Sequence, residues 1–285
     1  MRTDNIEHKA LFTIPTAAHN SVPANIKPLP PQRKITGHKQ TDAYLWVLEV
    51  VRLNELAHLD AAEAALEKIT ISPKEAEQQY SRYLLANDVH PLQVAFGTMG
   101  LDNPARAIQS ARENIKKAAG VRAIFGSYEA ALEDSEAERL IQSSAKYIDD
   151  HFWGWTAAEK KASSINGTRM NEIDEQRREL VDAYRDVLPE PHTLSDVVRE
   201  FIYWEWLYSV RNTAGKELGH EFGYSEHHES VYDRERYLDK LLATIKPVSR
   251  AEAAGVCQWF MSSEKGEYMD DNGAAVILNL VGECE

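Results

Sequence analysis

The chain has 285 residues, of which 43% are hydrophobic and 27% are charged, and its formal net charge at pH 7 is −13. A chain of this length and hydrophobic content buries a sizeable core, so a largely disordered protein is excluded. No run approaches the roughly 18 apolar residues that a membrane-spanning helix requires, so we expect no membrane partner. The acidic excess repels nucleic-acid phosphates. It therefore disfavours direct nucleic-acid binding and favours another protein with a basic surface as the partner.

Residues 1–40 differ from the rest of the chain in charge and in proline content. They carry a net charge of +4, which leaves −17 on residues 41–285. Five prolines between positions 15 and 31 cannot belong to a helix, so the segment is predicted to be an extended, basic arm. Arg33 and Lys34 follow a proline-rich stretch typical of segments that dock into aromatic grooves, and they are candidate protein-binding residues. The alternative is a poorly ordered leader, because terminal segments are ordered only where something ties them down.

The compartment is inferred from two weak signals. The first 20 residues lack the basic segment followed by an apolar run that marks a secretory signal. The two cysteines, Cys257 and Cys284, form neither a metal-binding spacing nor a disulfide framework. We therefore expect a cytoplasmic protein, and no cofactor is indicated.

From residue 41 onward the start and stop signals are those of helices. Ser72, Thr156, Thr193 and Ser249 are each followed three residues later by an acid, the arrangement of a capping box. No stretch alternates like a strand. The fold class is therefore predicted to be all-α, an irregular multi-helix bundle with an extended proline-rich N-terminal arm. Helices are expected at 41–59, 73–86, 103–120 (ended by Gly120), 127–150, 169–188, 194–213, 230–245, 250–263 and 273–281.

Two prolines in residues 188–193 are the best internal boundary. They favour a helical domain at 41–190 and either a second domain or a continuation of the same bundle at 191–285. The second part is built on the aromatic helix 194–213, in which almost every face is apolar. At 100° per residue, Glu205 falls on the same side as Phe201 and Tyr208. Glu205 is therefore predicted to take the place of a core residue and to pair with an arginine or a tyrosine.

A cluster of histidines and carboxylates follows this helix and suggests a metal-dependent helical enzyme as an alternative. Glu217 and His220 form a Glu-x-x-His pair, which projects both groups from one helix face, and Glu205, Glu221 and His227 are further candidate ligands. A complete two-metal site needs a second such pair, and the sequence has none. Convergence of Glu205 and the downstream imidazoles on one ion-sized or substrate-sized hollow would overturn the docking hypothesis.

Residues 71–100 imitate a helix-turn-helix, which makes a DNA-binding regulator a third possibility. The second helix of that imitation carries no Arg, Lys or Asn to reach base edges, which counts against it. Trp153 and Trp155 flank Gly154, and two tryptophans at a bend are candidate anchors for a protein contact.

The chain has no phosphate loop, dinucleotide fingerprint or nucleophile elbow. The leading hypothesis is therefore a non-enzymatic accessory or regulatory protein that acts by protein–protein binding. One subtype is an acidic inhibitor, of the kind that phages and plasmids encode, which occupies a basic nucleic-acid-binding surface. Neither the oligomeric state nor the identity of the partner follows from the sequence.

Overall fold

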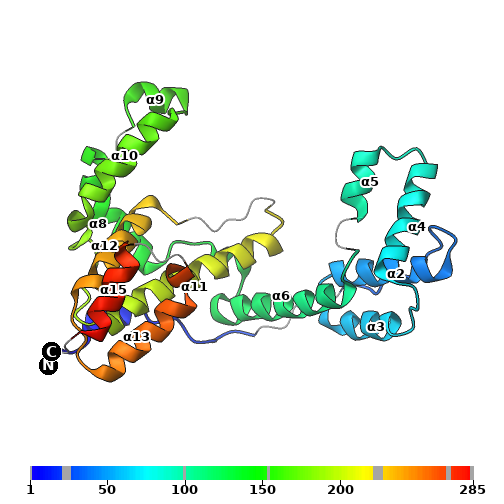
Figure 1. Cartoon of the computed structure of the whole chain (residues 1–285), viewed down its shortest axis with the longest axis horizontal. Helices are drawn as coiled ribbons and strands as arrows, with labels where there is room; N and C mark the ends of the chain where they lie inside the picture. The colour runs from blue at the N-terminus through cyan, green and yellow to red at the C-terminus, as the bar shows by residue number, and fades with distance from the viewer. Residues whose placement is uncertain are drawn as a thin grey trace. The chain divides into compact units, whose positions relative to one another are not determined.

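The computed structural model describes residues 2–20, 27–98, 101–152, 155–220, 227–267 and 271–282. Within these ranges the chain forms helices and no strand, so the predicted all-α fold class is confirmed (Figure 1). Each described helix is either too short or too polar to cross a lipid bilayer.

The chain forms two compact units. Unit 1 contains residues 1–16 and 131–285, and unit 2 contains residues 17–130. Unit 1 has 19 Lys and Arg against 33 Asp and Glu, a formal net charge of −14, whereas unit 2 is nearly neutral at +1. These division points differ from the boundaries expected at residues 40 and 190. The physical reason is that His8 and Phe12 are fully buried within unit 1, so the first residues are not part of an arm.

Unit 2 is built around three helices that share one core. Val47, Val50, Leu59 and Ile108 are buried together there. The expected helix at 41–59 is interrupted, because Asn54 adopts a φ of 59°, which helical residues do not. The helices of unit 2 are α2 (Lys39–Arg52), α3 (Leu56–Leu66), α4 (Pro73–Ala86), α5 (Pro91–Thr98), α6 (Pro104–Phe125) and α7 (Tyr128–Ala131), the last of which meets the unit boundary.

Helix α6 runs past the glycine that was expected to end it. Gly120 lies inside the helix, where glycine costs about 1 kcal/mol relative to alanine but does not block helical geometry. The helix ends at Phe125 and is capped by Gly126, whose φ of 80° is a conformation that favours glycine.

The extended segment before α2 is held against unit 2 by hydrogen bonds. The Trp46 indole donates to the Pro30 carbonyl at 2.7 Å, and the Lys27 amide donates to the Glu55 carboxylate at 3.1 Å. Residues 27–34 therefore form an extended strap that is tied to the surface of α2 and α3.

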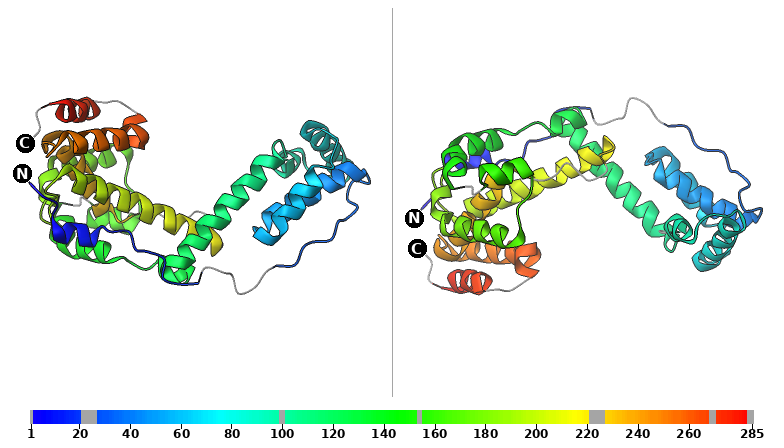
Figure 2. Two further views of the ribbon diagram at one scale, coloured as in Figure 1. Left: turned by 90° about the horizontal axis from the view of Figure 1, so that it is seen from below. Right: turned by 90° about the horizontal axis from the view of Figure 1, so that it is seen from above.

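Unit 1 packs its longest helix, α11, against α12 and α13. Helix α13, drawn in orange, can be followed beside α11 in Figure 2. Trp204 on α11 is fully buried among residues of α1, α8 and α12. The helix expected at 169–188 ends earlier, because the chain turns at Leu180 into a short 3₁₀ segment before Pro189. The helices of unit 1 are α1 (Ile6–Leu11), α8 (Glu136–Phe152), α9 (Ala157–Ala162), α10 (Gly167–Glu179), η1 (Val181–Tyr184), α11 (Leu194–Glu217), α12 (Glu229–Thr244), α13 (Arg250–Ser262), α14 (Glu264–Glu267) and α15 (Asp271–Val281).

Candidate functional site

The buried face of α11 decides which of its charged residues lie in the core. Glu200, Trp204, Leu207 and Arg211 recur at intervals of three or four residues and are buried. Glu205 lies off this face and is exposed, so the prediction that it replaces a core residue is wrong. Helix α11 carries aromatic residues on two sides. The side with Phe201, Glu205 and Tyr208, which the sequence pattern indicated as buried, faces the core only in part.

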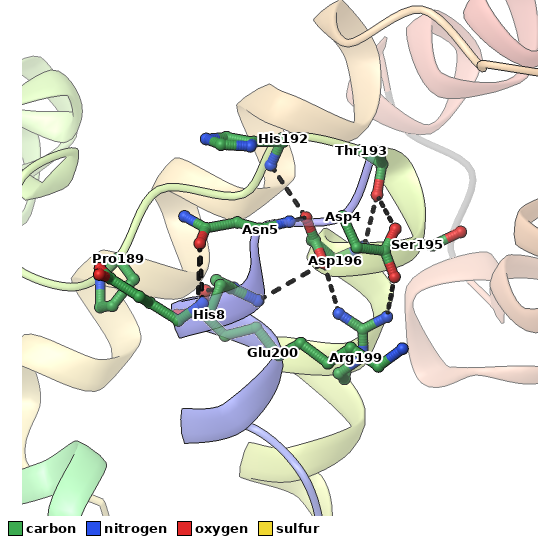
Figure 3. A network of polar contacts seen from close by, with 12 residues as sticks. Asp4, Asn5, His8, Pro189, His192, Thr193, Ser195, Asp196, Arg199 and Glu200 are labelled. Atoms are coloured by element: carbon green, nitrogen blue, oxygen red, sulfur yellow. Dashed lines mark hydrogen bonds and ion pairs between the residues drawn. The ribbon is translucent and has the colours of Figure 1, made fainter. Parts of the chain in front are cut away.

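Glu200 is the centre of a buried ion-pair network (Figure 3). His8 Nε2 on α1 donates to Glu200 Oε2 at 2.8 Å, and Arg234 Nε on α12 donates to Oε1 at 3.0 Å. All three side chains are fully buried. Burial acts to raise the pKa of Glu200, but the charge of Arg234 and the hydrogen bonds from His8 and Arg234 outweigh it, so the pKa is lowered. The carboxylate is therefore ionised and fully engaged.

Arg234 also binds the backbone of the segment that leads into α11. Its Nη1 donates to the carbonyl oxygens of Tyr184 and Arg185 at 2.7 and 2.8 Å, and its Nη2 donates to that of Pro189 at 3.2 Å. A guanidinium has five donors in a fixed fork, so one arginine can satisfy a carboxylate and several carbonyls at once.

A second ring of contacts joins the residues before α1 to the start of α11 (Figure 3). The Asn5 amide donates to Asp196 Oδ2 at 2.8 Å, and Arg199 donates to Asp4 Oδ2 at 2.6 Å. Burial acts to raise the pKa of Asp4, but the hydrogen bonds from Thr193 and Arg199 lower it. The network therefore connects the N-terminal residues up to α1 with α11 and α12. Its role is structural, because its carboxylates are already paired.

The network fixes the relative position of α11 and α12, and both helices project side chains into one pocket. Phe201 follows Glu200 on α11, and Glu235 follows Arg234 on α12. The pocket has a volume of about 370 Å³. Among the described residues, its lining includes four aromatic rings, Phe201, Tyr208, Tyr232 and Trp259, and three carboxylates, Glu205, Glu235 and Glu264. We call it the acidic aromatic pocket.

One ammonium group already lies in this pocket. Lys265 Nζ on α14 is 4.1 Å from the centroid of the Phe201 ring and 2.7 Å from Asp239 Oδ1. Trp259 extends the aromatic wall, because its ring stacks on Phe201 at a centroid distance of 5.6 Å. The face of an aromatic ring attracts a cation through its quadrupole, so the position of Lys265 shows that the pocket accommodates positive charge.

Glu235 has a perturbed carboxyl group in the wall of the pocket. Burial raises the pKa of Glu235 to about 7, and the neighbouring charges of Asp239, Glu200 and Glu205 act in the same direction, whereas Lys265 opposes them. A cation that enters the pocket favours the ionised form of this carboxyl, so the binding of a cation is coupled to the release of a proton.

His227 contributes a neutral ring to the lining. Its Nε2 donates to the Trp204 carbonyl oxygen at 3.0 Å, which leaves the lone pair of the neutral ring on Nδ1. Within the described ranges, Nδ1 is buried and has no hydrogen-bond partner. Burial lowers the pKa of His227, so the ring stays neutral and adds no positive charge that would repel a cation.

A larger hollow of about 570 Å³ lies between the end of α1, α11 and α13, but it offers less chemistry. Its polar side chains are already engaged: Arg199 binds Asp4, and Ser195 Oγ donates to Glu252 Oε1 at 2.8 Å. The acidic aromatic pocket is therefore the better candidate site.

The structure brings together two of the five residues that the metal alternative named. Glu205 and His227 both line the acidic aromatic pocket, whereas His220 does not, so the convergence that would overturn the docking hypothesis is met by one imidazole only. Glu217 and His220 are exposed near the C-terminal end of α11, and Glu221 lies outside the described residues. Across the described ranges, no group of three or more His, Cys, Asp or Glu side chains is placed to hold a metal ion.

Metal analysis tests this alternative directly. Protein purified without chelator should contain less than about half an equivalent of transition metal, because the described residues offer no group of ligands placed to hold the ion. Stoichiometric zinc, iron or manganese that is lost in a Glu217→Gln variant would revive the metal-dependent reading.

The candidate protein-binding residues belong to both units. Trp153 lies outside the described residues, and Trp155 is half-buried in unit 1 just before α9. Arg33 and Lys34 are exposed on the strap of unit 2, where Arg33 lies 3.7 Å from the Glu49 carboxylate. Their role in binding stays a prediction.

Helices α4 and α5 do form a helix pair at 71–100, as the third possibility required. The second helix, α5, exposes Leu92 by 61% and Phe96 by 67%. Apolar side chains offer no donors to base edges or phosphates, so this surface does not favour DNA binding.

Sequence reasoning missed His8, Arg234, Glu235 and Lys265. A signal existed for the first two: Asp196 and Glu200 are spaced by four residues on the inner side of an aromatic helix, a pattern that requires basic partners inside the core. No comparable signal marked Lys265, because α14 is only one turn long. Comparison of the chain with protein-family models, with curated proteins and with solved structures finds no match, so the site is interpreted from its own geometry.

Proposed function

We propose that this protein binds a basic partner protein and that the acidic aromatic pocket receives a cationic side chain of that partner. The observation that supports the proposal is the joint lining of one pocket by four aromatic rings and three carboxylates. Cation–π contacts contribute about 0.5–2 kcal/mol each, and nearby carboxylates add directional attraction.

The charge of unit 1 supports the same proposal at longer range. A net charge of −14 attracts a basic surface before contact and raises the association rate, whereas nearly neutral unit 2 contributes little to this attraction. The inhibitor subtype, in which carboxylates replace phosphates on a nucleic-acid-binding surface, is one way to use such a unit.

Calorimetry with a lysine-rich peptide tests the proposal. The full chain should bind the peptide, and affinity should fall at least fivefold between 50 and 200 mM salt, because rim charges are screened at about the 10 Å scale. The double variant Glu205→Gln/Glu264→Gln should bind about tenfold more weakly, a loss of about 1.4 kcal/mol.

The matched control is Glu175→Gln/Glu179→Gln, which removes the same charge from exposed positions on α10, away from the pocket. It should weaken binding less than threefold, the residual effect of net charge. Binding that ignores salt, or equal losses in the two double variants, would contradict the proposal. If n-butylammonium binds as tightly as the peptide, the ligand is a small amine and not a protein.

A further inference from the structure

The ammonium of Lys265 marks a specific position inside the acidic aromatic pocket. It contacts the face of Phe201 at 4.1 Å and donates to Asp239 Oδ1 at 2.7 Å. An aromatic face and one carboxylate oxygen on a compact cation are the contacts that a primary ammonium makes best, whereas a planar guanidinium prefers two parallel hydrogen bonds.

The backbone that carries Lys265 is held in place by a close approach. A Cβ atom at Gly266 would lie 2.4 Å from the Phe260 carbonyl oxygen, so a larger residue cannot occupy this position without displacing α14 from the end of α13. The Gly266 amide also donates to the Ser263 carbonyl oxygen at 3.1 Å. The stem of Lys265 is therefore anchored, and its flexible side chain carries the ammonium to Phe201.

The ion pair itself is partly open to solvent. The side chains of Lys265 and Asp239 are 29% and 31% exposed. Ion pairs with this exposure are weak, because water competes for both partners. An incoming ammonium with a similar aliphatic stem can replace Lys265 without disturbing the buried network.

We propose that a primary-ammonium subsite lies at the edge of the acidic aromatic pocket, formed by Phe201 of the lining and by Asp239 next to it, and that Lys265 occupies this subsite until a lysine side chain of the partner displaces it. This inference rests on the proposed function and adds the class of the cation and an internal competitor. Because Lys265 competes for the subsite, it lowers the affinity for the partner's lysine, and its removal strengthens binding.

The experiment compares the full chain with Lys265→Met and with Lys240→Met. Both substitutions remove one positive charge from unit 1, but Lys240 pairs with Asp182 on an exposed surface outside the pocket lining. Calorimetry with a lysine-rich peptide, an arginine-rich peptide and n-butylammonium should give about tenfold tighter binding of the lysine peptide and the amine to Lys265→Met, with less than a twofold change for Lys240→Met. The arginine peptide should gain less than the lysine peptide.

A second variant and an NMR measurement on the unmodified chain distinguish the loss of an internal competitor from an effect of misfolding. In the Lys265→Met background, Asp239→Asn should reverse most of the gain. In the unmodified chain, the NMR signals of the Lys265 Cε methylene should move toward their solvent-exposed values as n-butylammonium is added.

The other outcomes show whether the internal competitor alone or also the proposed function is disproved. If the wild-type chain binds the lysine peptide and Lys265→Met does not improve it, the internal competitor is disproved and the proposed function stands. Equal gains in Lys265→Met and Lys240→Met indicate a net-charge effect and also disprove it. If neither the wild type nor Lys265→Met binds any of the probes, both proposals fail.

Discussion

Replacement of Arg234 by methionine is expected to lower the free energy of unfolding of unit 1 by about 3–5 kcal/mol. The arginine neutralises Glu200 in a fully buried position and satisfies the carbonyls of Tyr184, Arg185 and Pro189. Methionine has a similar stem but no donors, so the carboxylate and the carbonyls remain buried without their partner. Urea unfolding followed by tryptophan fluorescence measures the loss, since five of the six tryptophans belong to unit 1.

Lys240→Met on the same helix is the control for this measurement. Lys240 forms an exposed pair with Asp182, and such pairs contribute about 0–1 kcal/mol. Substitution of both Arg234 and Glu200 by methionine should cost less than the sum of the two single changes, because no charge is then left uncompensated. If Arg234→Met is no more destabilising than Lys240→Met, the network does not stabilise the protein in the way described.

Replacement of Glu235 by glutamine should stabilise the protein at high pH. Burial raises the pKa of Glu235 from 4.5 to about 7 in the folded chain, so the folded state prefers the protonated acid. The stabilisation from this protonation is complete below pH 4.5 and is lost as the pH rises through 7. Glutamine imitates the protonated acid at every pH, so the variant should exceed the wild type by about 1–3 kcal/mol at pH 8 and by almost nothing at pH 4.

Urea midpoints of wild type and Glu235→Gln, measured between pH 4 and 8, give this difference directly. The two curves should diverge between pH 4.5 and 7. Parallel curves would show that the Glu235 carboxyl ionises as it does in the unfolded chain, and the proton release expected on cation binding would then have no source.

The sequence predicts helix starts well because a capping box is a local interaction. Ser72 with Glu75, and Thr156 with Glu159, both form the reciprocal hydrogen bonds that their spacing indicated. Helix ends were less predictable. Gly120 is tolerated within α6, because the packing of Ile108, Ala111 and Ala118 outweighs the cost of one glycine.

The buried charges show why the site was only partly predictable. Arg177 is buried beside Ile173 on α10, and it donates to Asp233 on α12. Nothing local indicated which acid it would meet, since the two residues are 56 positions apart. Glu205 and His227 were named as candidate metal ligands, and both line the acidic aromatic pocket. The neighbours that define their pocket come from α12, α13 and α14, whose packing is a tertiary property.

The position of His8 also changes how the N-terminal region is to be tested. Deletion of residues 1–40 removes a fully buried histidine and Phe12 along with the strap, so lost binding could report lost folding. Substitution of Arg33 and Lys34 by serine leaves the core intact and tests the strap alone.

The separation of His8 from its partners has a consequence for biosynthesis. All of unit 2 has been translated by residue 130. His8 and Arg234 both bind the Glu200 carboxylate, so the network that includes His8 is incomplete until Arg234 has been translated. At ~5–20 residues per second, about 5–20 s pass between the completion of unit 2 and the appearance of Arg234 on the ribosome. During that interval Glu200 lacks the arginine that neutralises it, so the His8–Glu200–Arg234 network is completed only after most of the chain has been made.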